Sequence, residues 1–226
     1  MELQALGPYL EDRTPIRFAA LLAREIGGLA KPDGYDESRS GGVDVALTAT
    51  IYTFEIELSD VDRGVYETLP LRVARHPSET EEYLVMRVLA YCLEYAVGIS
   101  FSKGLADPDE PTLAVRDLTG VIRVWIDIGA PDAARMHKAG KAAARVVVYT
   151  HKDPEKLLRQ WSGERIHRGE ELELYSVDHA LLVALAARLN RRLTFAISVT
   201  GGRLYVTIGD EVLEGAVERH SVVAGG

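Results

Sequence analysis

Segments with the apolar period of a β-strand alternate with segments of helical spacing along this chain, and this alternation limits the folds open to it. Apolar side chains occupy every second position in residues 52–58 and again in residues 121–128. Residues 146–149 are apolar throughout, as in a central parallel strand covered by helices on both faces. Helices are predicted at 78–96, 133–144, 154–161 and 178–189. The pattern predicts an α/β domain with a mixed β-sheet flanked by helices.

Hairpins are predicted at both ends of this pattern. The turn-forming run 59–64 separates strand 52–58 from residues 69–73, and Pro70 within the second segment favours an edge strand. Near the C-terminus, Thr200-Gly201-Gly202 is typical of a tight turn between two strands. These antiparallel additions make the predicted sheet mixed.

The helix predicted at 78–96 has a defined start and end. Ser78 is the expected N-cap, and Glu81 three residues later would complete a capping box. Gly98 is expected to end the helix. Cys92 lies on the apolar stripe of this helix, so we expect it to be buried and inert, and as the single cysteine it fits a reducing compartment.

The chain of 226 residues divides by composition into residues 1–44 and 45–226. The first part contains a possible short helix at 16–26 and an aperiodic Pro, Gly, Asp and Ser run at 31–42, so we interpret it as a flexible N-terminal extension. Residues 45–226 are predicted to form a single domain. No apolar run approaches the roughly 18 residues needed to span a bilayer, and no secretory signal is evident. We therefore expect a cytoplasmic protein without a membrane partner.

Charge is unevenly distributed. The whole chain has a net charge of −8, whereas residues 131–168 contain nine Lys and Arg against four acids, a net +5. Two interpretations stay open for this segment. It consists either of surface helices that happen to be basic, or of a patch that faces the phosphates of a nucleic-acid partner.

Asp127 is the first candidate for chemistry, because it stands between Ile126 and Ile128 in an apolar strand. An ionised carboxylate in such a place must meet a cation, an Arg or Lys, a backbone donor or a water-filled cleft. The structural alternative is that Asp127 lies at the exposed end of the strand and caps the next turn.

The second candidate is the acidic run at 107–111, which includes Asp109 and Glu110 between two prolines. It is either an ordinary solvated loop or part of a cation site. If the loop meets Asp127 and the helix start with Glu79 and Glu82, their oxygens would suit Mg²⁺ or Mn²⁺. Zinc is less suitable, because the chain has one Cys and no His pair at ligand spacing.

Five short motifs, in order and spacing, resemble the YaeQ family of bacterial proteins. They are Ser59-Asp60-x-Asp62-Arg63, His76-Pro77-Ser78-Glu79-Thr80, Lys103-Gly104-Leu105, Asp109-Glu110-Pro111 and Trp125-Ile126-Asp127-Ile128-Gly129-x-Pro131-Asp132. The resemblance covers residues 46–149 and is looser beyond them.

The resemblance implies a variant of the restriction-endonuclease-like, PD-(D/E)XK fold with added β-hairpins. It places Asp109 or Glu110 at the first acid of that motif and Asp127 at the second. Glu79 or Glu82 corresponds to the helix acid. The motif's lysine, two positions after Asp127, is replaced by Gly129. Lys138, Lys141 or Lys103 would have to take its role in orienting the attacking water.

Two hypotheses for function follow. The first is a Mg²⁺-dependent nuclease or phosphodiesterase that uses these acids and one of the three lysines, with residues 131–168 contacting phosphates. The second is a non-catalytic interaction or regulatory protein on the same scaffold, whose acids would contact a protein partner. Gly129 and the acidic net charge favour this second hypothesis. A small-molecule enzyme finds no supporting cofactor motif.

Overall fold

A computed structural model describes residues 49–102 and 109–222 of the chain. The chain divides into two units, Met1–Val45 and Ala46–Gly226, and every described residue belongs to the second. The extension predicted at 1–44, with its helix at 16–26, lies outside the described residues.

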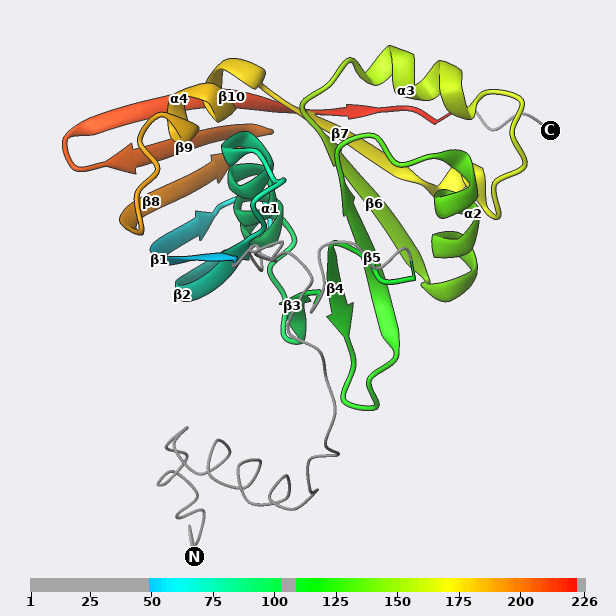
Figure 1. Ribbon diagram of the computed structural model, residues 1–226, viewed down its shortest axis with the longest axis horizontal. Coiled ribbons are helices and arrows are strands. Elements are labelled where there is room, and N and C mark those ends of the chain that lie inside the picture. Colours follow the sequence, from blue (N-terminus) through cyan, green and yellow to red (C-terminus); the bar gives the residue numbers. More distant parts are fainter. Residues whose placement is uncertain (1–48, 103–108, 223–226) are drawn as a thin grey trace, which may run out of the picture. The chain divides into compact units, whose positions relative to one another are not determined.

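The described residues form a single mixed sheet of ten strands in the order β2-β1-β8-β9-β10-β7-β6-β5-β4-β3 (Figure 1). The pairs β1–β8, β5–β6 and β6–β7 are parallel, and the other neighbours are antiparallel. The predicted mixed sheet is therefore confirmed. The strands are β1 (Thr50–Asp60), β2 (Val65–Arg75), β3 (Ile99–Phe101), β4 (Leu113–Arg116), β5 (Ile122–Ile128), β6 (Arg145–Thr150), β7 (Glu173–Val177), β8 (Arg192–Thr200), β9 (Arg203–Ile208) and β10 (Glu211–His220).

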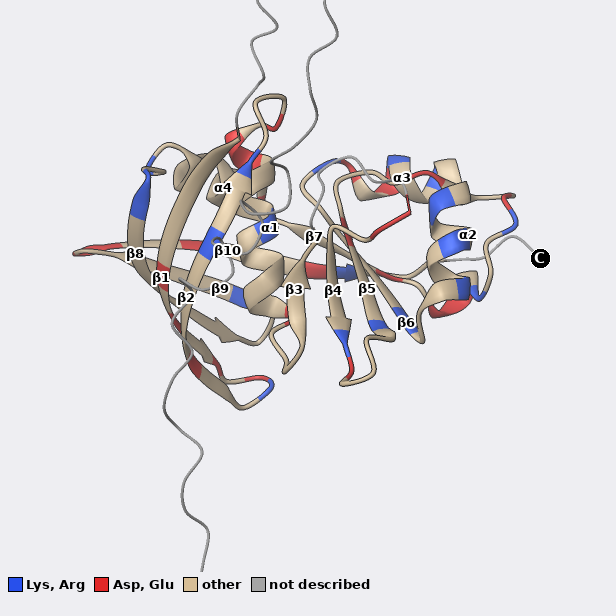
Figure 2. Ribbon diagram, turned by 60° about the horizontal axis from the view of Figure 1, so that its bottom comes forward, with Lys and Arg blue, Asp and Glu red and all other residues tan. Residues whose placement is uncertain are grey.

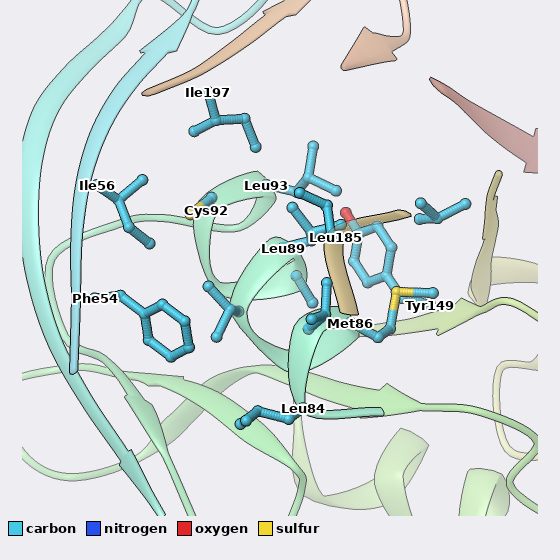
Figure 3. Packing of buried hydrophobic residues seen from close by; sticks show 14 of the residues in the cluster. Phe54, Ile56, Leu84, Met86, Leu89, Cys92, Leu93, Tyr149, Leu185 and Ile197 are labelled. Atoms are coloured by element: carbon cyan, nitrogen blue, oxygen red, sulfur yellow. The ribbon is translucent and has the colours of Figure 1, made fainter. Parts of the chain in front are cut away.

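Helices cover the sheet on two faces and create two separate cores. On one face, α1 (Glu81–Leu93) and α4 (His179–Ala186) pack against each other and against the larger core (Figure 1). Figure 3 shows Met86, Leu89 and Leu93 of α1 between Phe54, Ile56 and Ile197 on the strands and Leu185 of α4. On the other face, α2 (Ala133–Ala142) and α3 (Pro154–Trp161) cover β5, β6 and β7. Among the described helices, none has the length and apolarity needed to cross a membrane.

The central strands follow directly from their side-chain patterns. In β5, Ile126 and Ile128 enter the larger core while Trp125 enters the smaller one, which is the predicted alternation. In β6, Val147 and Tyr149 face the larger core, and Val146 and Val148 face the smaller core. The prediction of a parallel strand buried on both faces is confirmed.

The predicted hairpins also form. β1 pairs with β2, which contains Pro70 and stands at the end of the sheet, as expected for an edge strand. β8 and β9 pair across Gly201 and Gly202, both at positive φ, a conformation that glycine adopts without steric cost. Cys92 is fully buried and burial raises its pKa to about 12, so the expectation of an inert thiol is confirmed.

The start and end of α1 differ from the prediction. Thr80, not Ser78, is the N-cap, and its hydroxyl accepts a hydrogen bond from the Tyr83 backbone N–H. The preceding residues form a turn because Glu79 is directed inward to Arg87. At the other end, α1 stops at Leu93, since the side chain of Glu94 turns toward Arg145.

Arg63, from the turn between β1 and β2, closes the C-terminal end of α1. Its guanidinium donates to the carbonyl oxygens of Cys92 (3.0 Å) and Tyr95 (3.2 Å), and to the buried carboxylate of Asp60 (2.6 Å). The carboxylate of Asp62 accepts from the backbone N–H groups of Gly201 and Gly202. The Ser59–Arg63 motif therefore connects the β1–β2 turn by hydrogen bonds to the end of α1 and to the β8–β9 turn.

Replacing Arg63 by Ala should lower the free energy of unfolding by about 2 kcal/mol, because it removes the counter-charge of the buried Asp60 carboxylate and one donor to each of two carbonyls at the end of α1. Urea unfolding measures the effect. Arg72→Ala, at an exposed position of β2, is the matched control and should change stability by less than about 0.5 kcal/mol. Equal effects of the two substitutions would contradict this role of Arg63.

Candidate functional site

Several of the predicted site residues lie around the end of β5, where α1 begins and where the chain enters β4. The parallel strands β5 and β6 both end at this edge, with Gly129 and His151 just beyond them. The first turn of α1 faces the same edge, since Tyr83 lies 3.8 Å from the position that a Cβ of Gly129 would occupy. Ligands of α/β sheets bind preferentially at such edges.

Asp127 is 2% exposed and its carboxylate is surrounded by donors. Arg135 of α2 holds it in a bidentate pair, Nε to Oδ2 at 2.7 Å and Nη2 to Oδ1 at 2.8 Å. The backbone and hydroxyl groups of Thr112 donate to Oδ1, and the indole of Trp125 donates to Oδ2. The inference that Asp127 must meet an Arg or a backbone donor is thus correct. The alternative of an exposed cap is wrong, because the side chain is buried between the sheet and α2.

Glu79 is engaged in a second buried pair. Its carboxylate accepts from Arg87 at 2.9 Å and 3.2 Å and from the backbone N–H of His76 at 3.1 Å, and both charged side chains are 4% exposed. Arg87 also donates to the carbonyl of Ala74 in β2. Glu79 therefore ties the start of α1 to the end of β2. Burial lowers the pKa of His151, and Glu82, in the first turn of α1, is close enough for its charge to oppose that lowering in part.

The residues before β4 are tied to α2. Lys138 forms an ion pair with Asp109, and Arg135 donates to the carbonyl oxygen of Glu110 at 2.7 Å. Lys141 is exposed in the last turn of α2. Lys103 lies outside the described residues. The fold thus brings Asp109, Glu110 and Lys138 near Asp127 through α2, whereas Glu79 belongs to a separate pair.

Mg²⁺ and Mn²⁺ require several carboxylate or carbonyl oxygens with free lone pairs. The five donors on Asp127 leave its oxygens no such capacity, and Glu79 is neutralised by Arg87. Within 49–102 and 109–222, no three His, Cys, Asp or Glu side chains are grouped to hold a metal ion. The residues present therefore do not fit the expected divalent ion, and that ion stays a prediction.

Much of the basic character of residues 131–168 is used inside the molecule. Arg135 and Lys138 pair with acids, Arg145 pairs with Glu94 and Glu173, and Arg168 donates to the carbonyls of Gly140 and Ala143 at the end of α2. The remaining basic side chains lie on or beside α2 and α3 (Figure 2). This arrangement favours the interpretation of helices with a basic surface over a patch for phosphates.

A cavity of about 380 Å³ lies between the start of α1 and the ends of β5 and β6. Its lining residues come from three segments of the chain: His76, Ser78, Glu79, Thr80 and Tyr83; Ile128, Gly129 and Ala130; and His151 and Lys152. Burial raises the pKa of Tyr83, so its phenol stays protonated at neutral pH. Nδ1 of His151 is buried and has no hydrogen-bond partner within the described residues. The cavity combines apolar walls with polar groups, as small-ligand sites do.

Sequence reasoning missed the residues that define this arrangement. The sequence did not identify the partners of Asp127, which are Arg135 and Thr112, or the partner of Glu79, which is Arg87. Each partner lies on a different element from its acid or far from it along the chain. His151 and Lys152 follow β6 directly, and the position of polar residues just after a buried parallel strand was an available signal. His76 accepts a hydrogen bond from the Ser78 backbone N–H and also lines the cavity.

Comparison with known proteins gives a consistent result. A family model described as YaeQ protein matches residues 45–217. The chain is 31% identical over 172 residues to an uncharacterized protein of Escherichia coli K12, and 29% identical over 171 residues to one of Salmonella typhi, with 75% of this chain and 94% of each relative covered. The crystal structure of YaeQ from Xanthomonas axonopodis pv. citri has a TM-score of 0.71, 31% identity, and coverage of 78% of this chain and 100% of that one. The Pseudomonas syringae structure has a TM-score of 0.69, 30% identity, and coverage of 76% and 95%.

Asp127→Asn should destabilise the protein by about 3 kcal/mol, because it leaves the buried end of Arg135 without its counter-charge and turns an amide NH₂ toward other donors. The midpoint of urea unfolding provides the measurement. Asp210→Asn, at an exposed position between β9 and β10, makes the same chemical change at the surface and should be neutral. A neutral Asp127→Asn would mean that the ion pair contributes no net stability.

His151 should titrate below the ordinary histidine value of about 6.5. Burial, together with the charges of Lys152 and His179, lowers the pKa of its imidazole. As pH falls through about 6.5, the unfolded chain takes up a proton that folded His151 resists, so the free energy of unfolding decreases. NMR titration of the imidazole Cε1–H gives the pKa directly, with His151→Gln to assign the signal. A midpoint above 6.5 is incompatible with this environment.

Proposed function

The chain belongs to the YaeQ family, and from this premise we propose that it is a non-catalytic binding or regulatory protein on a restriction-endonuclease-like scaffold. One observation carries the proposal. The carboxylate of Asp127, which a nuclease of that scaffold would use to hold its metal, accepts five hydrogen bonds, two of them from the bidentate Arg135. Gly129 at the position of the motif lysine removes a second catalytic group.

The scaffold part of the proposal is supported by the order of elements. After α1, strands β3, β4 and β5 form an antiparallel series, and α2 then leads to β6, which is parallel to β5. This is the helix, mixed sheet and helix order expected from the motifs. The β1–β2 and β8–β9 pairs extend the sheet as added hairpins.

A Mg²⁺-dependent nuclease is the second candidate, and one observation favours it. Glu79, the helix acid, and Gly129, beyond β5, line the same cavity. Activity would require Arg135 to leave Asp127 and a lysine such as Lys138 to leave Asp109. Breaking a buried bidentate pair costs several kcal/mol, so the binding role is the better supported. In either role we propose a cytoplasmic protein.

Adding millimolar Mg²⁺ or Mn²⁺ should leave the melting temperature of the purified protein unchanged. A metal ion raises the melting temperature only if it binds the native state, and a non-catalytic protein without a metal site would not bind it. Single- and double-stranded DNA and RNA should remain uncut under the same conditions. Ca²⁺ serves as a control for general ionic effects. A metal-dependent rise that disappears in Asp127→Asn, together with cleavage, would establish the nuclease instead.

A further inference from the structure

The cavity at the start of α1 has a cationic and hydrogen-bond-donating lining. Glu79 is the single carboxylate among the described residues that line it, and both of its oxygens are directed to Arg87. Lys152 contributes a formal positive charge, and no acid of the lining neutralises it. The lining is therefore suited to an anion.

His76 is set as a donor by its neighbours. The backbone N–H of Ser78 points at its Nδ1 at 3.2 Å, and a backbone N–H can only donate, so Nδ1 is the acceptor. In the neutral ring the proton then resides on Nε2. The hydroxyl of Ser78 lies 2.6 Å from the same Nδ1 and also lines the cavity. The hydroxyl of Ser78 therefore donates to Nδ1, and Nε2–H is the donor that His76 keeps for a ligand.

His151 also lines the cavity. Its ring lies nearly parallel to that of His179, with centroids 6.2 Å apart and an interplanar angle of 15°. Nδ1 is buried without a partner within the described residues, which is costly unless a ligand or water completes it. Glu82 partly offsets the positive charge here. An anion in the cavity would give His151 an acceptor and favour its protonated form.

Gly129 keeps the cavity open. It lies at φ +93°, and a Cβ there would be in van der Waals contact with the Tyr83 ring at 3.8 Å. A lysine at this position would extend its side chain into the space that now forms the cavity. The residue that removes a catalytic lysine from the motif therefore also creates room for a ligand.

From these features we propose that the cavity binds a small phosphate monoester, with Lys152, His151 and His76 contacting the phosphate. The volume of about 380 Å³ suits a sugar phosphate or a mononucleotide, with Tyr83 and Ile128 beside the organic part. This inference rests on the proposed binding role and names its ligand class.

The test is an NMR titration of the full chain with ribose 5-phosphate, inorganic phosphate and AMP, followed through the amide signals of Ser78, Gly129 and Lys152. Lys152→Glu should weaken binding of ribose 5-phosphate at least about tenfold, the loss expected for one charge-assisted contact. Lys141→Glu makes the same charge change at the exposed end of α2 and should bind within about twofold of the wild type.

Each outcome decides between alternatives. Equal losses in Lys152→Glu and Lys141→Glu would indicate unspecific attraction and overturn the proposal, as would unchanged binding in both. A 5′-phosphorylated oligonucleotide that binds where ribose 5-phosphate and AMP do not would assign the cavity to a nucleic-acid end instead.

Failure of this inference is distinguishable from failure of the proposed function. Without phosphate binding, an unchanged melting temperature in Mg²⁺ still supports a non-catalytic protein whose ligand is of another class. Phosphate-ester binding that requires Mg²⁺ and ends in hydrolysis would overturn both.

Discussion

The bidentate pair between Asp127 and Arg135 joins three parts of the fold through one guanidinium. Arg135 extends from α2 to the buried carboxylate on β5 and also binds the carbonyl of Glu110, just before β4. Its guanidinium lies 5.6 Å from the centre of the Trp125 ring, where a cation–π contact adds to the attraction. A charge buried this completely is tolerated only because each lone pair has a donor. The five hydrogen bonds that stabilise the Asp127 carboxylate also occupy the oxygen lone pairs that a metal ion would need.

Arginine pairs of the same kind fix α1 at both ends. Arg87 joins its start to Glu79 and β2, and Arg63 binds the carbonyls at its end. Arg145, from β6, pairs with Glu94 just after the helix and with Glu173 on β7. With α1 held at both ends, the first turn that lines the cavity has a fixed place in the fold. A ligand of the kind proposed would therefore not have to order this part of the chain on binding.

Periodicity predicted most of the elements because the relevant strands are buried on at least one face. β5, β6, the β8–β9 hairpin and the edge position of β2 all follow from local patterns and from Pro70. β10 was not predicted, since only Gly215 of its ten residues is buried and the strand has no apolar period. Yet β10 pairs with both β9 and β7 and so joins the two halves of the sheet. β4 was not predicted either, because its four residues are too few to show an apolar period.

The candidate site was predictable only in part. The anomaly at Asp127 is visible from its apolar neighbours, and its need for a counter-charge follows from solvation. The cation that pairs with Asp127 is Arg135 of α2. This pairing depends on how α2 packs against β5, which the spacing of residues along the chain does not reveal. Likewise, Glu79 belongs to a sequence motif that predicts a metal-binding site, whereas in the structure its carboxylate is directed inward to Arg87.

The two borders of the ten-stranded sheet bear on how the molecule behaves at high concentration. At one border, Pro70 in β2 has no N–H to offer an incoming strand. At the other, β3 is three residues long and gives too short a template for stable growth. A wide sheet with such borders resists edge-to-edge polymerisation, the hazard that open sheets face in a crowded solution. The proline and the short strand thereby protect the fold from fibril-like self-association without adding to its stability.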